Sequence, residues 1–262
     1  MKINYLILSF VILSIFTNCS ANETEQQTPS QIVQIQDTQE EEFDDFEDEY
    51  QEDETSSNPF ESYNIVMTDF NDGIYTYVYN PLVIGYKKIV PNSKGNLIKN
   101  AFQNLMFPIR FVNNIFQLKF VNSAEETGRF LINSTLGVLG LCDVAKNYFD
   151  LEAHNEDFGQ TLGHWGVGGG YHIVLPIFGP SNMRDMFSMY PDAFVNPIAY
   201  TEHTPYNITS GIPEALLVTT YQRINAGSLH VGEYEELKKE AITLYPFLRD
   251  VYEQHRQQQI EK

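Results

Sequence analysis

The sequence predicts an all-α fold for one body that covers residues 58–256. Two observations predict this class. Apolar residues recur there at spacings of three and four, the period of one face of an α-helix. Alternation of apolar and polar residues, which marks a half-buried strand, is scarce, and its best example at 75–79 also fits a helical period. The body has about 200 residues and no internal repeat, which suits a single domain.

The first expected helices precede residue 120. One covers 63–77, with apolar residues at spacings of four, three, four and three, and should end near Pro81. A second covers 97–105 and should end before Pro108, because proline removes a backbone donor and clashes with the preceding turn. Apolar residues predict a third helix at 111–116.

Capping signals predict the start of the next helix. Asn122 is followed three residues later by Glu125, and Ser123 is followed by Glu126. A polar residue that caps the first turn, with a glutamate three positions on, satisfies two backbone donors reciprocally. We therefore expect a helix that starts at this point and carries the apolar residues of 124–132.

Two prolines mark helices near the carboxyl end. Pro213 precedes Glu214, and a first helical turn tolerates proline, so a helix is expected to start there and to continue to Ile224. The last segment, 237–248, places leucines and an alanine on one face. Within it, Pro246 is expected either to kink the helix or to divide it in two.

The central segment, 158–183, has no charged residue and contains seven glycines and two prolines. These glycines and prolines exclude an uninterrupted helix. The segment is either a buried irregular connection, in which glycine permits close backbone approach, or a wall of an amphipathic cavity or a segment in a membrane interface. Composition alone leaves these interpretations open.

Charge is distributed unevenly along the chain. Sixteen Lys and Arg against 35 Asp and Glu give a net charge of −19. Residues 20–57 hold 14 of the acids, so 21 remain in 58–262 against 15 bases there, a difference of −6. The acidic stretch has few large apolar residues and is predicted to be a disordered tether, either a solvated spacer or an acidic docking segment. The scarcity of clustered cations argues against nucleic-acid binding and against electrostatic docking to anionic lipids.

The amino terminus has the order of a secretory signal. Lys2 is followed by an apolar run, 3–16, that is too short for a comfortable membrane span of about 20 residues. Cys19 stands where a bacterial lipoprotein signal is cleaved, which predicts lipidation of Cys19, although Asn18 departs from the small residue usual before that cysteine. Ser20 after the cysteine favours the outer membrane. The alternative is a signal cleaved elsewhere, with Cys19 incidental.

Motifs for covalent chemistry or metal binding are not evident. Six histidines lack ligand spacing, and two cysteines cannot form a disulfide framework. The sequence therefore predicts no metal, no cofactor and no enzyme activity. A triad of Ser181, His172 and Asp185 is conceivable because triads are defined by geometry. The interpretation we prefer makes Ser181 a helix cap, His164 and His172 structural or cavity-lining residues, and Cys142 a small buried hydrophobe.

A series of motifs in the body resembles a known family. In chain order they are Asn58-Pro59-Phe60-Glu61, Phe70-Asn71-Asp72, Pro108 with Phe111-Val112-Asn113-Asn114 and Gln117, 128–137, 140–145, 156–163, 165–168, Leu175-Pro176, Gly179-Pro180-Ser181, Arg184-Asp185, and 247–250 with Tyr252, Gln254 and Arg256. The chain resembles the MlaA (VacJ) family of outer-membrane phospholipid-transport lipoproteins over nearly the whole body. It departs from the family pattern at Gly170-Tyr171-His172, where Gly-Pro-Tyr is usual, and at Cys142, where Phe is usual.

This resemblance implies a ring-like helical domain with an amphipathic central channel. The ring would lie in the inner leaflet of the outer membrane of a Gram-negative bacterium. Phospholipid misplaced in the outer leaflet would pass through the channel to a soluble periplasmic carrier of the Mla system, and the ring would associate with a trimeric porin. The expected organisation is a signal peptide at 1–18, a tether at 19–57, the MlaA-like domain at 58–256 and a tail at 257–262.

The resemblance also suggests which residues form the channel. The family places Phe70-Asn71-Asp72 in an early helix near the channel, and the uncharged central segment suits a channel wall. The channel residues expected on this basis are Phe70, Asn71, Asp72, Gly159, Gln160, Gly163, Trp165, Gly166 and Gly168. Two other functions remain open: a porin-associated scaffold that moves no lipid, and a lipid hydrolase that uses Ser181.

Overall fold

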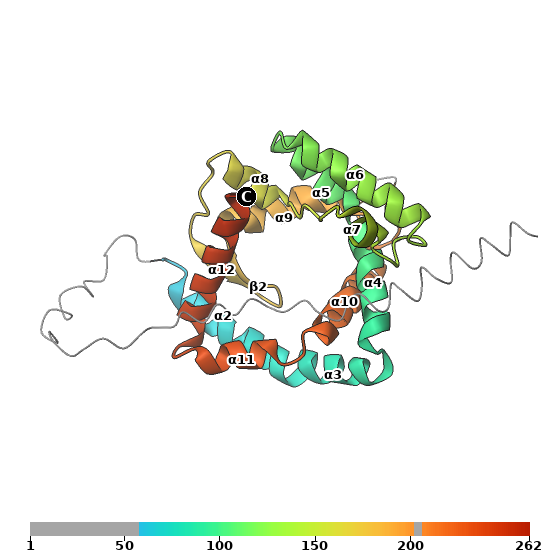
Figure 1. Ribbon diagram of the computed structural model, residues 1–262. Coiled ribbons are helices and arrows are strands. Elements are labelled where there is room, and N and C mark those ends of the chain that lie inside the picture. The colour runs from blue at the N-terminus through green and yellow to red at the C-terminus, as the bar shows by residue number, and fades with distance from the viewer. Residues whose placement is uncertain (1–57, 202–205) are drawn as a thin grey trace, which may run out of the picture.

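A computed structural model of the chain describes residues 58–201 and 206–262, in which helices follow one another around a ring (Figure 1). The predicted signal peptide, Cys19 and the predicted tether lie outside the described residues. The predicted all-α class is confirmed, with the addition of one small β-hairpin.

The elements in chain order are α2 Glu61–Ile74, the π-helix η1 Tyr75–Tyr79, α3 Asn80–Ile89, α4 Asn92–Leu105, α5 Phe107–Phe116, α6 Phe120–Thr135, α7 Val144–Phe149, α8 Phe158–His164, β1 His172–Leu175, β2 Gly179–Asn182, α9 Met183–Val195, α10 Ile212–Leu229, α11 Glu233–Glu240 and α12 Leu244–Ile260. The two strands are antiparallel, with His172 opposite Asn182 and Leu175 opposite Gly179.

The ring closes between the first and last described helices. In Figure 1, α2, α3 and α11 form the lower side, α4 and α10 the right, and α5, α8 and α9 the top. On the left, α12 packs against α2, α8 and strand β2. Segments from the two ends of the sequence are therefore neighbours, and the hairpin and α12 border the same part of the ring.

The first helix continues beyond the end predicted for it at Pro81. After α2, the backbone forms the π-helix η1 and then α3, with Pro81 in the first turn of α3. The N–H of Asn80 bonds the carbonyl oxygen of Tyr75, five residues back. A first turn tolerates proline because its N–H would have no partner there, and the π-helical turn accommodates the changed hydrogen-bond pattern.

Two predicted helix starts were wrong because the side chains in question bond elsewhere. Helix α6 begins at Phe120, before the predicted capping pairs, and Lys119 at its start makes no side-chain cap. Glu126 instead turns inward and accepts from Arg110 Nε at 2.7 Å. At α9 the cap is Asn182, whose side chain accepts from the N–H of Asp185, while the predicted cap Ser181 lies in β2.

The predictions for the last helices were correct. Pro213 lies in the first turn of α10. The segment 237–248 is divided, since α11 ends at Glu240 and α12 begins at Leu244, which places Pro246 in the first turn of α12. Proline lacks an N–H, and a first helical turn does not use one.

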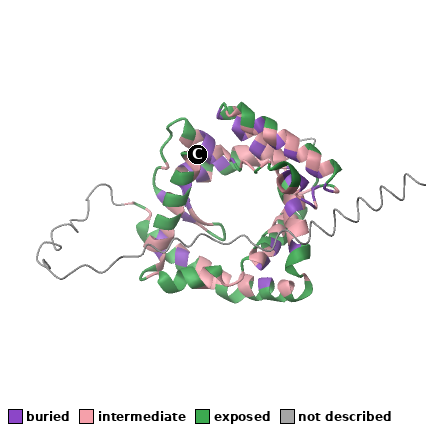
Figure 2. Ribbon diagram, in the orientation of Figure 1, coloured by how far each residue is buried: buried purple, intermediate pink, exposed green. Residues whose placement is uncertain are grey.

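Figure 2 shows where the buried residues lie in the wall of the ring, and most of these residues are polar. Among the described residues, buried polar and charged side chains clearly outnumber buried apolar ones. A small apolar cluster surrounds Cys142 and Val144, with Leu97 and Ile132 packed on it, which confirms that Cys142 is buried. Many large apolar side chains are exposed instead. Soluble proteins usually bury such residues, so this distribution indicates a surface that meets something other than water.

Candidate functional site

Two asparagines on one face of α2 hold the hairpin. Asn64 donates to the carbonyl oxygen of His172 at 2.9 Å and accepts from the N–H of Val174 at 2.8 Å. Asn71, two helical turns later, donates to the carbonyl oxygen of Leu175 at 2.9 Å and accepts from the N–H of Ile177 at 2.7 Å. Each amide supplies one donor and one acceptor, as a neighbouring strand would. The hairpin is thus bonded to α2 along β1.

The neighbours of Asn71 differ from it in role. Phe70 is half exposed. Asp72 accepts from Tyr234 Oη at 3.1 Å and from Lys238 Nζ at 2.6 Å, both on α11. In the predicted Phe70-Asn71-Asp72 motif, the two polar residues therefore link α2 to the hairpin and to α11, and the aromatic residue lies at the surface.

Helix α8 is packed closely against α9 and α12. A Cβ at Gly159 would lie 2.3 Å from Asp185 Oδ1 and 2.6 Å from Arg256 Nη2, so a larger residue does not fit there. At Gly163 a Cβ would lie 2.5 Å from Ile260 Cδ1. Gln160 is buried and forms a capping box with Asp157 at the start of α8. These predicted channel residues therefore support the contact between helices.

The loop after α8 is exposed. Trp165 donates from Nε1 to the carbonyl oxygen of Phe116 at 2.9 Å, while 58% of its surface stays accessible. Gly166 adopts φ +84°, a left-handed conformation that favours glycine. Gly168 has open space where a side chain would project. The structure thus separates the predicted glycines into a packed pair on α8 and an exposed pair in this loop.

A network of charged side chains joins α8, α9 and α12. Arg256 donates to both oxygens of Asp185 and to both oxygens of Asp157, at 2.8 to 3.0 Å. Arg184 and Tyr252 also donate to Asp185, at 2.9 and 2.6 Å. Burial alone would raise the pKa of Asp185, but these hydrogen bonds lower it to about 2. Asp185 is therefore ionised over the physiological pH range.

A cavity of about 230 Å³ adjoins this network. Its apolar lining consists of Leu175, Phe178, Pro180 and Met189. Hydroxyl groups come from Ser181, Ser188 and Tyr252. The charged lining consists of Asp157, Asp185, Asp192 and Arg256. The cavity is therefore amphipathic, and four of its residues belong to the uncharged central segment, for which a cavity wall was one of the interpretations.

Asp192 differs from the other acids of the cavity. Its Oδ1 accepts from Asn113 Nδ2 at 3.0 Å, and its Oδ2 accepts from the N–H of Phe158 at 3.1 Å. Among the described residues, it makes no ion pair at 4.0 Å or less. Burial raises the pKa of Asp192 to about 6, with a further increase from the charge of Asp157. A carboxylate that lines a cavity and has a raised pKa is a candidate binding group.

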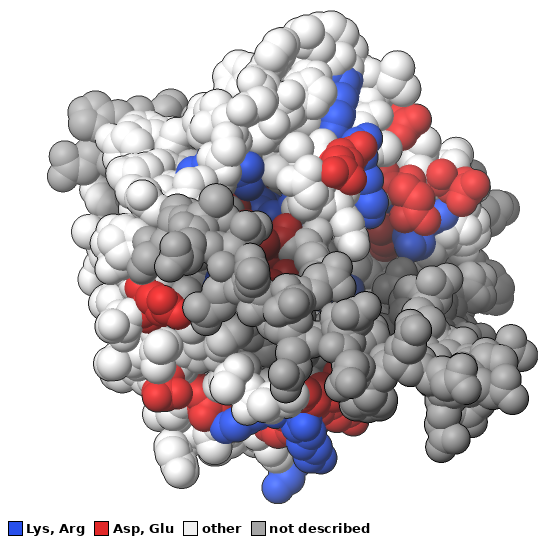
Figure 3. All heavy atoms as spheres, turned by 90° about the vertical axis from the view of Figure 1, so that its left-hand side faces the viewer, with Lys and Arg blue, Asp and Glu red and all other residues white. Residues whose placement is uncertain are grey.

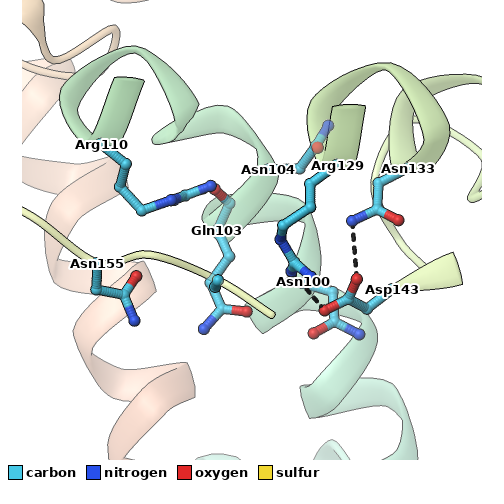
Figure 4. A pocket seen from close by; sticks show the side chains of 9 residues that line it. Asn100, Gln103, Asn104, Arg110, Arg129, Asn133, Asp143 and Asn155 are labelled. Atoms are coloured by element: carbon cyan, nitrogen blue, oxygen red, sulfur yellow. Dashed lines mark hydrogen bonds and ion pairs between the residues drawn. The ribbon is translucent and has the colours of Figure 1, made fainter. Parts of the chain in front are cut away.

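A second polar cluster lies between α4, α6 and α7 (Figure 4). Arg129 donates to Asp143 at 2.8 Å and to the carbonyl oxygen of Leu151, and Asn133 donates to Asp143 at 2.9 Å. Further amides complete the cluster: Asn100, Gln103, Asn104 and Asn155. The enclosed space is about 10 Å³, which is too small for an organic ligand. This cluster therefore holds helices together.

The conceivable triad is not assembled. Ser181 Oγ faces the carbonyl oxygen of Asn182, His172 Nδ1 lies 2.9 Å from Glu253 Oε1, and Asp185 is engaged by arginines. His172 is buried in the hairpin, whereas His164 is exposed and its ring meets that of Trp165. In the described part of the chain, His, Cys, Asp and Glu side chains form no group suited to a metal ion.

Sequence reasoning missed the cavity's charged residues as a site. Asp157, Asp185, Asp192 and Arg256 are distributed over about 100 positions and converge only in the fold. Three of them, Asp157, Asp185 and Arg256, belong to motifs that carried the family resemblance, and this was the available signal. Within 58–201 and 206–262, none of the helices combines the length and the apolar character needed to cross a membrane.

A family model and several relatives match the chain. A family model described as MlaA lipoprotein matches residues 56–259. An uncharacterized protein of Rickettsia prowazekii is 35% identical over 151 residues, which are 57% of this chain and 60% of that protein. The intermembrane phospholipid transport system lipoprotein MlaA of Haemophilus influenzae is 30% identical over 199 residues, 75% of this chain and 76% of the relative. The chain thus spans about 60% of the length of the Rickettsia prowazekii relative.

A solved structure has the same fold. It comes from work on the structural basis for maintenance of bacterial outer membrane lipid asymmetry. The TM-score is 0.64 at 26% identity, and the match covers 78% of this chain and all of that one. Because the family model spans most of the chain and the ring is shared with this structure, the chain belongs to the MlaA lipoprotein family.

Proposed function

We propose that this protein is an outer-membrane lipoprotein that removes misplaced phospholipid from the outer leaflet and so maintains lipid asymmetry. Phospholipid would enter the ring, pass its amphipathic interior, and leave to a soluble periplasmic carrier of the Mla system. The names of the relatives support phospholipid transport as the process. The ring and its amphipathic cavity support a route through the protein. Transport of this kind needs no covalent chemistry, because the protein only lowers the desolvation cost of moving a headgroup past lipid tails.

One observation carries this proposal: large apolar side chains are exposed and polar side chains are buried, the reverse of a soluble protein. Apolar side chains lie exposed at the turn between α5 and α6 and in the loop after α8: Phe116, Leu118, Phe120, Val121 and Trp165. The buried set is mainly asparagine, serine and paired charges. Lipid around the ring accounts for the exposed apolar side chains, whereas a scaffold in water would bury them.

The outer surface is consistent with insertion into one leaflet. On the side of the ring that faces the viewer in Figure 3, charged side chains gather at the lower edge and at the upper right, and uncharged atoms occupy the upper left. Aromatic residues such as Tyr190 and Phe187 on α9 are also exposed. Aromatic side chains suit the boundary between lipid and water. We propose that the ring lies in the periplasmic leaflet.

The finer assignments complete the proposal. Lipidation of Cys19 after removal of 1–18 would anchor the protein, and the acidic residues 19–57 would tether the domain 58–256 to that anchor. A trimeric porin would hold the ring in place. Of the nine residues named from the resemblance, the exposed ones, Phe70, Trp165, Gly166 and Gly168, would border the channel. The other five, Asn71, Asp72, Gly159, Gln160 and Gly163, would support its wall. Several acyl chains anchor a protein stably, whereas one holds it only marginally.

The test is the lipid content of the outer leaflet in cells that lack the protein. Transport predicts phospholipid accumulation there, reversed by the wild-type gene. Normal outer-leaflet composition together with altered porin complexes would favour the scaffold function instead. Lipid copurifying with the full-length protein gives a second readout that does not depend on the porin.

A further inference from the structure

We propose that the 230 Å³ cavity is a headgroup subsite for phospholipids that carry an amine, with Asp192 as the counter-ion of the ammonium group. The ligand class is the phosphoethanolamine headgroup. This inference rests on the proposed function and adds to it a preference among phospholipids.

The size and the lining of the cavity fit a headgroup with the start of an acyl region. The cavity has about 230 Å³ of space, which is enough for a polar headgroup. Leu175, Phe178 and Pro180 from the hairpin form the apolar side. On the polar side, Asp157 caps α8, Asp185 and Asp192 lie on α9, and Arg256 lies on α12. A ligand that is polar at one end and apolar at the other matches both sides.

The hydrogen-bond inventory favours a donor over an acceptor in this cavity. Arg256 already donates to Asp157 and Asp185, and Tyr252 donates to Asp185. Ser188 Oγ donates to the carbonyl oxygen of Asp185 at 2.7 Å. The donors of the lining are thus occupied by the protein, whereas carboxylate oxygens retain acceptor capacity. A protonated amine supplies the donors that this surface lacks, and an anionic headgroup does not.

The balance of charge identifies Asp192 as the group that meets the cation. Asp185 is neutralised by Arg184 and Arg256, and Asp157 shares Arg256. Asp192 receives only neutral donors, from Asn113 and the backbone of Phe158, among the described residues. A partly buried carboxylate that no ion pair neutralises destabilises the folded state, as expected of a group retained for binding.

The experiment uses the full-length protein purified in detergent and exchanged into mixed micelles with equal amounts of dioleoyl phosphatidylethanolamine and dioleoyl phosphatidylglycerol. Bound lipid is extracted and quantified by mass spectrometry. The wild type should retain phosphatidylethanolamine in excess, and Asp192→Asn should reduce that excess by about tenfold, the effect of one charged hydrogen bond. In Asp192→Asn the single side-chain oxygen can occupy the place of Oδ1, which accepts from Asn113 Nδ2 at 3.0 Å and from the N–H of Phe158 at 3.2 Å. The variant also removes a partly buried charge, so it should fold at least as well as the wild type.

The matched control is Asp250→Asn, which alters an exposed carboxylate paired with Arg249 outside the cavity and should retain the wild-type ratio. Glycerophosphoethanolamine, which lacks acyl chains, should not displace the bound lipid; complete displacement would overturn the lipid assignment. Equal retention of both lipids by the wild type, or an unchanged ratio in Asp192→Asn, overturns the subsite and leaves transport standing. Retention of no phospholipid at all counts against the proposed function itself.

Discussion

The guanidinium carbon of Arg223 lies 4.6 Å from the centroid of the Phe178 ring. Phe178 is in the turn of the hairpin, and Arg223 is on α10, which forms a different side of the ring in Figure 1. This contact therefore connects the hairpin turn to α10, while Asn64 and Asn71 bond β1 to α2. The hairpin is thus held by two helices that are distant from it in sequence.

Arg223→Ala should loosen the hairpin turn without destabilising the ring. A cation–π contact between exposed groups contributes about 0.5–1 kcal/mol, so global stability should change little. Amide hydrogen exchange at 177–179 should become faster. Arg249→Ala, which removes a longer contact over Tyr245 at 5.9 Å, is the control and should leave exchange in the turn unchanged. Equal exchange in both variants would show that Arg223 does not restrain the turn.

Deletion of Phe70 and Asn71 should alter lipid distribution more than protein abundance. Removing two residues rotates the remainder of a helix by about 200°, so the bonds of Asn71 to Leu175 and Ile177 are lost. The hairpin then loses part of its support on α2. Outer-leaflet phospholipid and immunoblots of the protein are the measurements. Asn71→Ala isolates the hydrogen bonds, and loss of the protein itself in the deletion would contradict the prediction.

Much of the helical fold could be predicted from periodicity and proline positions, because an amphipathic helix leaves a local signal. Pro213 lies in a first turn as predicted, and the segment around Pro246 is divided, with Pro246 in the first turn of α12. The hairpin was missed because each strand has only four residues and its partners are the amides of Asn64 and Asn71, more than 100 positions away. The start of α6 was missed because Glu126 pairs with Arg110 rather than capping.

The candidate site was predictable only in part. The uncharged segment 158–183 suggested a cavity wall from composition, and Leu175, Phe178, Pro180 and Ser181 do line the cavity. Asp192 carries no local signal, since its role depends on Asn113 and Phe158 reaching it from α5 and α8. Residues that meet only in the folded protein show no regular spacing in the sequence, so a motif search does not detect them.

Gly159→Ala should destabilise the protein by about 1–3 kcal/mol, the usual effect of overpacking. The added Cβ would meet Asp185 and Arg256, whose ion pair connects α9 to α12. Thermal unfolding measures the effect. Gly168→Ala is the matched control, because nothing lies within 4 Å of its Cβ, and its stability should stay within about 0.5 kcal/mol of the wild type. Similar melting temperatures for both variants would refute this account of α8.

Gly168→Leu should impair lipid retrieval while the protein stays folded and membrane-bound. The position has room for a side chain, so any defect reflects the surface of the loop rather than packing. Gly166 is less suitable for this test, because φ +84° makes any substitution there strained. Normal outer-leaflet composition in cells that express Gly168→Leu would remove this loop from the proposed channel.

Ser181→Ala should leave the lipid phenotype unchanged. Ser181 Oγ faces a backbone carbonyl oxygen, and His172 is bonded to Glu253, so the serine has no general base. Complementation of cells that lack the protein, with outer-leaflet phospholipid as the readout, measures this. Failure of Ser181→Ala to complement, at normal abundance, would support the hydrolase function instead.

The stability of the wild type should fall as the pH rises from about 4 to about 6. Burial raises the pKa of Asp192 from 3.8 to about 6. Of the nearby charged groups, Asp157 raises this pKa further and Arg256 lowers it. The folded protein therefore binds more protons than the unfolded chain in this window, and the free energy of unfolding decreases by up to about 3 kcal/mol as they dissociate. Asp192→Asn has no proton to lose there, so its stability should change less between pH 4 and 6 and should exceed that of the wild type at pH 7. Denaturant unfolding at both pH values tests this, and parallel profiles for the two proteins would mean that Asp192 is not the titrating group.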